Sequence, residues 1–269
     1  GSDVWFGTAG ENARQRIDRL VPKGLACPRC ASRDHLAIHD HIVDVWFESG
    51  VSHSAVLGRD PHLPWPADLY LEGHDQYRGW FHSSLLVAVN DRGRAPYKGV
   101  VTHGFTMDGE GKKMSKSVGN VISPLDVADK RGAEILRLWV SMIDFLEDMR
   151  LSPEILDRNA EAYRKIRNTF RYLLGNLAGF DPRSDAVPAA ELHEIDRWAL
   201  QQLESLRARV LSGYEGHQYH LVYHALNSFV TVTLSSFYLD VLKDRLYTSP
   251  RASVARRSAQ TVLWRMASE

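Results

Sequence analysis

Short apolar runs separated by turn residues characterise the first 150 residues of this chain. The runs at 68–71 and 99–102 are typical of short buried strands bounded by Gly, Pro and Asp. Between them, residues 79–89 have the length and apolar content of a helix. A strand, a helix and a second strand in this order predict a right-handed βαβ unit with a parallel sheet. The turn-rich residues 107–111 predict a hairpin or a mobile loop.

Helix signals dominate the rest of the chain. Ser123 and Ser152 each precede a proline, as capping serines do at a helix start. The β-branched residues 230–233 fit a regular helix poorly, and 181–188 have the composition of a linker. We therefore predict an α/β domain followed by an all-α helix bundle, with a boundary near residue 150. Further helices are predicted over 132–142, 154–178, 190–211, 217–234, 236–246 and from Pro250 onward, with Ser249 as the cap.

Composition narrows the function classes. The chain has 269 residues with 33 basic and 33 acidic side chains, so its formal net charge is zero. This balance argues against a protein that binds nucleic acid by bulk charge alone, but it is compatible with a local basic face. No apolar run approaches the roughly 18 residues of a membrane span, and no secretory signal is recognisable. Two cysteines cannot make a disulfide framework, which fits a reducing, cytoplasmic setting.

The densest chemical pattern is GEGKKMSKS at residues 109–117. Two glycines loosen the backbone, and three lysines and two serines follow within six residues. Ammonium groups, hydroxyls and backbone amides suit a polyphosphate, and a mobile loop can close on charge that develops in a transition state. The alternative is a solvated basic hairpin tip. A P-loop is excluded, because the pattern Gly-x-x-x-x-Gly-Lys-Ser/Thr does not occur.

Polar side chains also follow the first predicted strand. Glu72, Asp75 and Gln76 come directly after it, and Trp80 lies four residues further on. Open α/β sheets bind ligands at the carboxyl ends of their strands, where a carboxylate could hold an amine and Trp80 could wall an apolar pocket. The alternative is an ordinary polar strand-to-helix connection with Trp80 in the core. The pattern does not separate these two interpretations.

Two more segments could supply ligand-binding residues. Residues 44–50 read either as a strand that ends in a ligand loop or as an ordinary buried strand and turn, and the second interpretation is favoured. Residues 102–105 place His103 and Phe105 after a strand. A lone His in such a place is more often structural than catalytic.

Cys27 and Cys30 have the spacing of half a zinc site. His35, His39 or His41 could complete the ligands, but no second cysteine pair exists in this chain. The alternatives are a degenerate knuckle without metal and a site whose other half lies elsewhere. We therefore do not expect bound zinc.

Arginines gather on one long predicted helix. Arg164, Arg167 and Arg171 are spaced by three and four residues, so they share one helix face. Such a face could contact the phosphates of a nucleic acid. A solvated face partly paired with Glu161 is an equally good interpretation of each single arginine.

Together these segments resemble one family. Residues 113–117, KMSKS, resemble the second signature of class I aminoacyl-tRNA synthetases. The resemblance extends from about residue 42 to the C-terminus. It implies the second half of a Rossmann-like nucleotide-binding fold at 42–150, a helix-bundle anticodon-binding domain at 151–269, and a connective segment at 1–41. The stretches that resemble the isoleucyl-tRNA synthetase branch are 44–50, 70–81, 102–105, 132–139, 163–168, 236–240 and 243–245.

The family implies ATP-dependent ligation of isoleucine to tRNA(Ile). The isoleucine carboxylate would attack the α-phosphate of ATP, giving isoleucyl-adenylate and pyrophosphate, and the acyl group would then pass to the terminal adenosine of the tRNA. No covalent enzyme intermediate is needed, so catalysis would depend on positioning and electrostatics. Mg²⁺ would accompany ATP. The full-length protein would be a cytoplasmic monomer that does not bind membranes.

The resemblance also implies roles for individual residues. The catalytic loop would comprise Lys113, Ser115, Lys116 and Ser117, with Lys116 on the developing pyrophosphate. ATP and the adenylate would contact His103, Gly104, Phe105, Met114 and Lys116. The amino-acid site would comprise Trp46, Glu72, Gly73, Asp75, Gln76 and Trp80, with Glu72 on the amino group. Contacts to tRNA would come from Arg164, Arg167 and Arg171.

The sequence also departs from the family pattern. The earlier His-x-Gly-His signature is absent, and so is the large editing domain. The chain stops inside a predicted helix, so we expect an internal segment of a longer protein that lacks half of the active site. Gly1 and Ser2 could be a cloning remnant or native residues. The alternatives are a non-catalytic tRNA-binding module and a valine- or leucine-specific relative, although Gln76 and Trp80 favour isoleucine.

Overall fold

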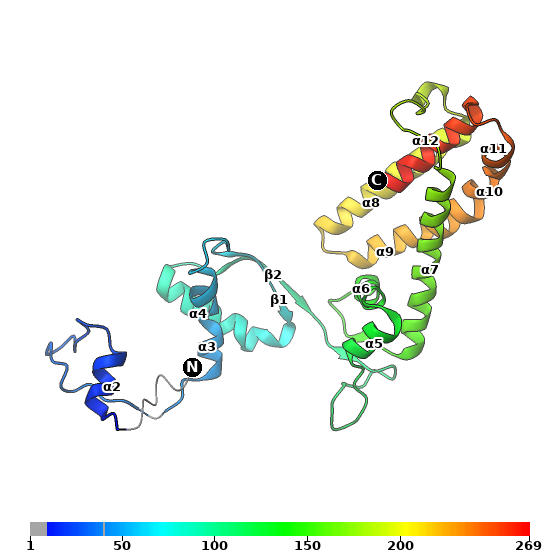
Figure 1. Cartoon of the computed structure of the whole chain (residues 1–269). Helices are drawn as coiled ribbons and strands as arrows, with labels where there is room; N and C mark the ends of the chain where they lie inside the picture. Colours follow the sequence, from blue (N-terminus) through cyan, green and yellow to red (C-terminus); the bar gives the residue numbers. More distant parts are fainter. Residues whose placement is uncertain (1–9, 40) are drawn as a thin grey trace. The chain divides into compact units, whose positions relative to one another are not determined.

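The computed structural model describes residues 10–39 and 41–269, and its internal contacts divide the chain into two compact units (Figure 1). Unit 1 comprises the described residues of 1–68 together with Gln76–Lys98. Unit 2 comprises Leu69–Asp75 together with Gly99–Glu269. Gly1 and Ser2 lie outside the described residues. The boundary near residue 150 between the two expected domains stays a prediction.

Unit 1 is built around two helices that pack together, α3 (Val45–Gly50) and α4 (Trp80–Arg92). The indole N–H of Trp80 donates to the Ser49 carbonyl at 3.0 Å and so ties α4 to the end of α3. The helix predicted over 79–89 is therefore confirmed. Two other short helices of this unit are α2 (Ala13–Leu20) and the π-helical turn η1 (His53–Leu57).

Residues 44–50 are helical, so the predicted strand and turn are wrong. Asp44 explains the difference, because its carboxylate accepts the backbone N–H of Trp46 at 2.8 Å and caps the first turn. Gly50 then lies so close to α4 that a Cβ would be 3.0 Å from the backbone of Ser83. The cap and this close helix contact outweigh the β-propensity of the aromatic and β-branched residues.

The predicted strand–helix–strand order is confirmed. β1 (Ala67–Gly73) and β2 (Tyr97–His103) precede and follow α4 and pair in a two-stranded sheet. The backbone N–H of Ala67 donates to the Pro96 carbonyl at 2.9 Å, so the two strands begin side by side. This is the arrangement expected of a parallel pair joined by a helix. A 3-10 helix, η2 (His74–Arg78), connects β1 to α4.

A second small sheet belongs to unit 2. β3 (Thr106–Met107) pairs in parallel with β4 (Met149–Arg150). After β3 the chain forms a tight turn, and Met107 makes an antiparallel bridge with Lys113, in agreement with the hairpin predicted at 107–111. The helices α5 (Pro124–Arg131) and α6 (Ala133–Met142) follow this turn.

An apolar core packs α5 and α6 against the start of α7 (Pro153–Asn176). The buried amide of Asn159 in α7 donates to the Ile135 carbonyl at 2.6 Å. Ser123 and Ser152 cap α5 and α7, so both predicted helix starts are confirmed. Met149 of β4 is part of this core, so β4 packs against the helices. The core residues are Val127, Ile135, Trp139, Met149, Leu151 and Leu156.

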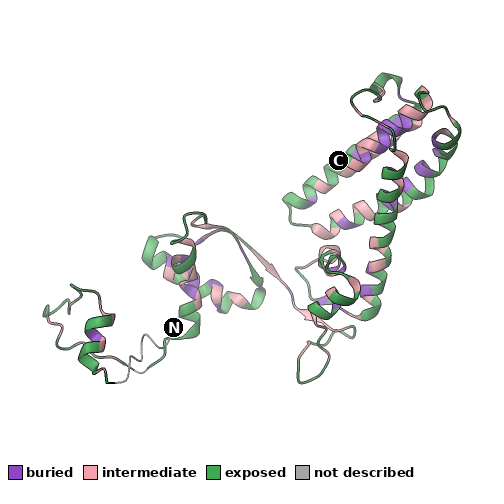
Figure 2. Cartoon of the chain, in the orientation of Figure 1, coloured by how far each residue is buried: buried purple, intermediate pink, exposed green. Residues whose placement is uncertain are grey.

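The remainder of unit 2 is a helix bundle (Figure 2). Its most continuous buried stretch is 258–263, where α12 packs against α7 and α8. None of the helices in the described residues combines the length and hydropathy of a membrane span. The bundle adds η3 (Ala189–Glu191), α8 (Glu194–Glu215), α9 (Tyr219–Ser228), the π-helix η4 (Phe229–Tyr238), α10 (Leu239–Val241), α11 (Lys243–Thr248) and α12 (Val254–Ser268).

A fully buried carboxylate, Asp196, joins four segments of the bundle. It accepts hydrogen bonds from the Tyr238 hydroxyl at 2.7 Å, from the Arg245 guanidinium at 2.7 and 2.8 Å, and from the Ser258 hydroxyl. Burial by itself raises the pKa of Asp196, but these hydrogen bonds and the charge of Arg245 outweigh it and leave the pKa below its ordinary value. The side chain is therefore an ionised anchor of the bundle.

Two helix boundaries in the bundle differ from the prediction. The chain is π-helical over η4, across the gap between the helices predicted at 217–234 and 236–246. The Ser235 hydroxyl donates to the Val230 carbonyl at 2.8 Å, five residues back, which suits the wider π turn. The predicted cap Ser249 is also wrong. Ser253 caps α12 instead, because 251–252 form a turn first.

Candidate functional site

The turn after β2 holds its backbone rigidly. The N–H of Gly104 donates to the Phe145 carbonyl at 2.8 Å, and the N–H of Phe105 donates to the Asp148 carboxylate at 2.8 Å. Gly104 is buried, and a Cβ there would collide with the backbone of Glu147 and Asp148. Only glycine fits this close approach. The residues predicted to flank adenosine therefore lie on a turn fixed to the segment that leads into β4.

A compact group of residues in unit 2 lies beside this turn. Gly73 is buried, and a Cβ there would be 2.7 Å from the Asp75 carboxylate and 3.7 Å from the rings of His103 and Phe105. The His74 ring meets the Phe105 ring edge to face at a centroid distance of 4.8 Å. Four of the predicted site residues, Gly73, Asp75, His103 and Phe105, are thus close together. Glu72 is exposed at the end of β1.

The KMSKS loop (Lys113–Ser117) begins next to the same aromatic ring. The Lys113 ammonium lies 5.9 Å from the centroid of Phe105, within the range of a cation–π contact. The hydroxyls of Ser115 and Ser117 are 3.2 Å apart, and the Ser115 hydroxyl accepts the Val118 N–H at 3.3 Å. These serines therefore order the loop internally. The ammonium groups of Lys113 and Lys116 are on exposed side chains, as a phosphate-binding role requires.

The other predicted amino-acid residues, Trp46, Gln76 and Trp80, belong to unit 1. They meet around Gly79, where a Cβ would be 2.6 Å from the Gln76 side-chain oxygen and 2.9 Å from the Trp46 ring. The Gln76 side chain accepts the backbone N–H of Trp80 at 3.0 Å and so fixes the start of α4. Trp80 is half-buried, and its indole N–H is held by Ser49. The expected site residues thus form two groups, one in each unit.

Cys27 and Cys30 are free thiols. Within residues 10–39 and 41–269, no three His, Cys, Asp or Glu side chains gather as candidate metal ligands. His39 and His41 contact each other, with ring centroids 6.0 Å apart. Hydrogen bonds from the amides of Arg29 and Cys30, and then from the Cys30 side chain, lower the pKa of the Cys27 thiol.

The predicted basic face is present on α7. Arg164, Arg167 and Arg171 are all exposed and line one shallow surface depression together with Phe170 and Leu174. Arg164 forms an ion pair with Glu161, as the alternative interpretation of a solvated, paired face expected. An ion pair between two exposed side chains is weak, so Arg164 could exchange its partner for a phosphate at little cost.

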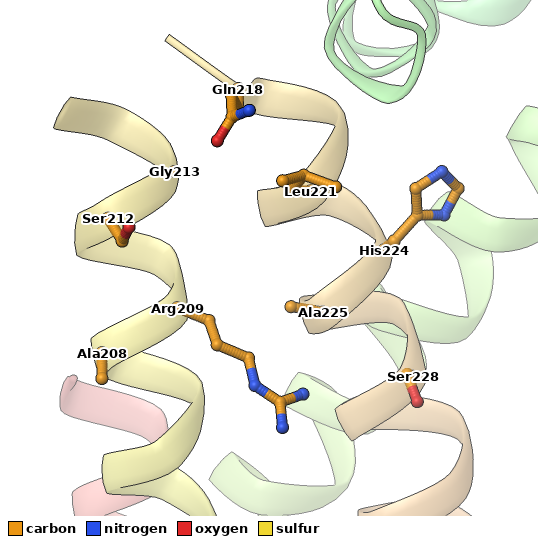
Figure 3. A pocket seen from close by; sticks show the side chains of 9 residues that line it. All are labelled: Ala208, Arg209, Ser212, Gly213, Gln218, Leu221, His224, Ala225 and Ser228. Atoms are coloured by element: carbon orange, nitrogen blue, oxygen red, sulfur yellow. The ribbon is translucent and has the colours of Figure 1, made fainter. Parts of the chain in front are cut away.

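A further depression lies between α8 and α9 (Figure 3). The Arg209 side chain reaches from α8 toward α9, whereas the His224 ring points away from α8. The two helices approach closely at Gly213, where a Cβ would be 2.6 Å from the Val222 side chain. Sequence reasoning missed this surface, because its polar residues lie on two different helices. Gly213 lies beyond the predicted end of this helix at residue 211, so the pattern gave no sign of a helix contact there.

Two residues beside the KMSKS loop were also missed. Asn120 donates a hydrogen bond to the carboxylate of Asp108 at 2.9 Å, so the two residues close the loop at its base. This hydrogen bond, and then the amide of Lys112, lower the pKa of Asp108. The signal in the sequence was an Asp at the start of the turn and an Asn directly after Gly119.

Comparison with known proteins gives a consistent result over the whole chain. The family model for class I tRNA synthetases (I, L, M and V) matches residues 8–152, and the model for the anticodon-binding domain of tRNA ligases matches residues 196–269. The isoleucine–tRNA ligase of Syntrophotalea carbinolica is 57% identical over 99% of this chain, and that of Geobacter sulfurreducens is 54% identical over 98%. The chain spans 28% of the length of each.

Solved structures of more distant proteins share the fold. A leucyl-tRNA synthetase of Agrobacterium radiobacter in a ternary complex is 17% identical and has a TM-score of 0.65, covering 91% of this chain and 33% of its own. A methionyl-tRNA synthetase of Mycobacterium tuberculosis in complex with methionyl-adenylate is 22% identical and has a TM-score of 0.64, covering 85% of this chain and 47% of its own. The chain belongs to the class I tRNA synthetases of the isoleucine, leucine, methionine and valine group, with a Rossmann-like catalytic part followed by an anticodon-binding part.

Proposed function

We propose that this chain is a segment of an isoleucine–tRNA ligase, which activates isoleucine with ATP and transfers it to tRNA(Ile). The identity of 57% to a relative named as such a ligase supports this specificity within the family. The proposed segment contributes the KMSKS half of the catalytic site and part of the anticodon-binding domain. The full-length protein is proposed to be a cytoplasmic monomer.

The observation that carries this proposal is the position of the KMSKS loop beside the turn at His103–Phe105. Lys113 lies over the Phe105 ring, and Phe105 in turn packs against His74. We propose that the adenosine of ATP or of the adenylate lies along His103, Gly104 and Phe105 and contacts the backbone at Met114. The exposed ammonium groups of Lys113 and Lys116 then reach the phosphates.

The proposed chemistry is an in-line displacement. A carboxylate oxygen of isoleucine attacks the α-phosphorus of ATP, the bond from that phosphorus to the bridging oxygen breaks, and pyrophosphate leaves. Negative charge grows on the leaving group, and Lys116 is proposed to stabilise it. Ser115 and Ser117 keep the loop ordered while this happens, which reduces the reorganisation that the step requires. Mg²⁺ is expected to arrive with the phosphates of ATP.

Amino-acid binding is proposed for both groups of residues around β1 and α4. Glu72 is exposed and would hold the ammonium group of isoleucine. Gly73 and Asp75 support this end of β1, because Gly73 leaves room for the Asp75 carboxylate. Trp46, Gln76 and Trp80 would shape the apolar pocket for the isoleucine side chain. Their mutual contacts around Gly79 support a preformed pocket wall.

Isoleucine-dependent exchange of labelled pyrophosphate into ATP tests this function. We expect the full-length ligase that contains this chain to exchange fastest with isoleucine when isoleucine, valine, leucine and methionine are compared. The 269-residue chain alone is expected to be inactive, because it contains no His-x-Gly-His signature. A preference for another amino acid would contradict the proposed specificity. Robust exchange by the isolated chain would contradict the proposal that half of the site is missing.

A tRNA contact on α7 is a second proposal, supported by the shared exposed face of Arg164, Arg167 and Arg171. Binding of tRNA by this chain is expected to weaken with rising salt. Replacement of all three arginines by Ala should lower the affinity and the salt dependence. The matched triple replacement by Lys keeps the positive charge, and it should retain most of the affinity for tRNA and most of its salt dependence. Unchanged binding by the Ala variant would remove this surface as a tRNA contact.

A further inference from the structure

Asp108 and Asn120 flank the KMSKS loop without belonging to it. The side-chain N–H of Asn120 donates to Oδ2 of Asp108 at 2.9 Å, so the residues before and after the loop are joined. Both side chains are half-buried, whereas Lys113, Lys116 and Ser117 are exposed. The joined pair thus forms a fixed base from which the loop projects.

Asn120 holds the loop backbone on both sides of Met114. Its Oδ1 accepts the N–H of Ser115 at 2.9 Å, and its Nδ2 donates to the carbonyl of Lys113 at 3.3 Å. One side-chain amide therefore binds the peptide groups that precede and follow Met114. This arrangement fixes the direction of the backbone at the residue proposed to contact adenosine.

Asp108 decides which way the Asn120 amide faces. Its Oδ1 accepts the backbone N–H groups of Glu110 at 3.0 Å and Lys112 at 2.8 Å, so the carboxylate itself is held in place. An ionised carboxylate only accepts hydrogen bonds, and it therefore selects the NH₂ end of Asn120. The carbonyl end of the amide is then directed to Ser115. The lowered pKa of Asp108 keeps this carboxylate ionised at neutral pH.

We propose that Asp108 and Asn120 are a positioning pair that sets the backbone of the KMSKS loop, and through it Lys116, for the adenylate-forming step. Neither side chain needs to touch ATP. The pair acts by holding the loop near the geometry that the transition state requires. This inference rests on the proposed function, since it assigns a role within the activation of isoleucine.

Reciprocal substitution gives a sharp test. Asn120→Asp places two carboxylates against each other and removes the hydrogen bond between positions 108 and 120. Asp108→Asn replaces one of the two carboxylate oxygens by an NH₂ group, so the side chain can no longer accept from Asn120 and from the backbone N–H groups of Glu110 and Lys112 at the same time. The double variant Asp108→Asn/Asn120→Asp restores a donor opposite an acceptor and keeps an acceptor for the Ser115 N–H. It loses the donor to the Lys113 carbonyl, so the recovery is expected to be partial. Glu110→Gln is the matched control, because it removes a carboxylate from the same turn. Among the described ion pairs, the Glu110 side chain takes part in one, with exposed Lys112 at 2.8 Å.

The variants are to be compared in the full-length ligase that contains this chain, by isoleucine-dependent pyrophosphate exchange. Each single substitution is expected to lower kcat by up to about 100-fold with the KM for isoleucine nearly unchanged, because the geometry of the loop and not the amino-acid site is altered. The kcat of the double variant should be about tenfold higher than that of either single variant. Glu110→Gln should behave as wild type. A merely structural role would not give this pattern of loss and reciprocal recovery in kcat.

Amide hydrogen exchange over 109–120, measured on the same proteins, adds a second readout. Exchange should be faster in both single variants and slower again in the double variant. Wild-type kcat in the single variants, or a double variant no better than either single, would overturn the positioning role while the proposed function stands. Absence of isoleucine-dependent exchange in the wild-type ligase would instead overturn the proposed function, and the role of the pair in that step with it.

Discussion

At the scale of single residues, charged side chains of this chain serve two different purposes. Asp196 is buried and surrounded by donors from Tyr238, Arg245 and Ser258, so its charge stabilises the bundle. The KMSKS lysines and the arginine face of α7 are exposed, so their charges remain accessible to phosphates. Sequence spacing identified the exposed groups, because they gather in short segments. It could not identify Asp196, whose partners lie more than 40 residues away.

Replacement of Asp196 by Asn should strongly destabilise unit 2. The change leaves Arg245 largely buried, with 17% of its side chain exposed, and without its counterion, for which a loss of about 3–5 kcal/mol is expected. Urea unfolding followed by far-UV circular dichroism measures it. The control Glu204→Gln breaks the exposed pair with Arg207 and should cost less than about 1 kcal/mol. Equal losses in the two variants would contradict the assigned importance of Asp196.

His53 should make unit 1 less stable in mild acid. Burial, and then the positive charge of Arg92, lower the pKa of this histidine below 6.5, while Asp91 opposes the shift. The unfolded chain therefore binds more protons than the folded one just below pH 6.5, and the free energy of unfolding falls as the pH drops through that value. Above it the contribution is fully present.

NMR titration of the His53 ring checks this directly, and the midpoint is expected below 6.5. His53→Gln should remove the corresponding part of the pH dependence of unfolding. A His53 midpoint at or above 6.5 would contradict the argument.

At the scale of elements, local signals predicted helix starts where a single cap was available. Ser123 and Ser152 are each followed by proline, and both cap a helix as expected. Residues 44–50 were assigned wrongly because the cap at Asp44 and the contact of Gly50 with α4 outweigh strand propensity. The π-helix η4 could not be predicted, since its wider turn depends on hydroxyl-to-carbonyl hydrogen bonds that the pattern does not show.

The start of α12 gives an element-scale prediction. Ser253→Ala should lower the free energy of unfolding by about 1 kcal/mol, because the Ser253 hydroxyl accepts the Arg256 N–H and caps the helix. Ser249→Ala is the matched control, since the hydrogen bond from Arg256 to Ser249 is accepted by the backbone carbonyl, which the substitution leaves in place. It should change stability by less than half as much. The reverse order of effects in urea unfolding would restore Ser249 as the cap.

At the scale of the whole molecule, the predicted site residues belong to two units. The motif KMSKS, together with the stretches at 44–50, 70–81 and 102–105, predicted the family, which the comparisons confirm. The Asp108–Asn120 pair was not predicted, because it exists only once the loop has closed on itself. The predicted grouping of all amino-acid-binding residues in one place stays a prediction, since Glu72 and Trp80 belong to different units.

The central claim is that the KMSKS loop of this chain binds the phosphates during isoleucine activation. Its most direct test is to measure the kcat of pyrophosphate exchange in two matched variants of the full-length ligase. Lys116→Ala should lower kcat by about 100- to 1,000-fold, because it removes a charge proposed to stabilise the leaving pyrophosphate. Lys112→Ala lies in the same turn and removes an exposed pair with Glu110, and it should change kcat by less than about threefold. Wild-type exchange in the Lys116 variant, or equal losses in both, would contradict the account.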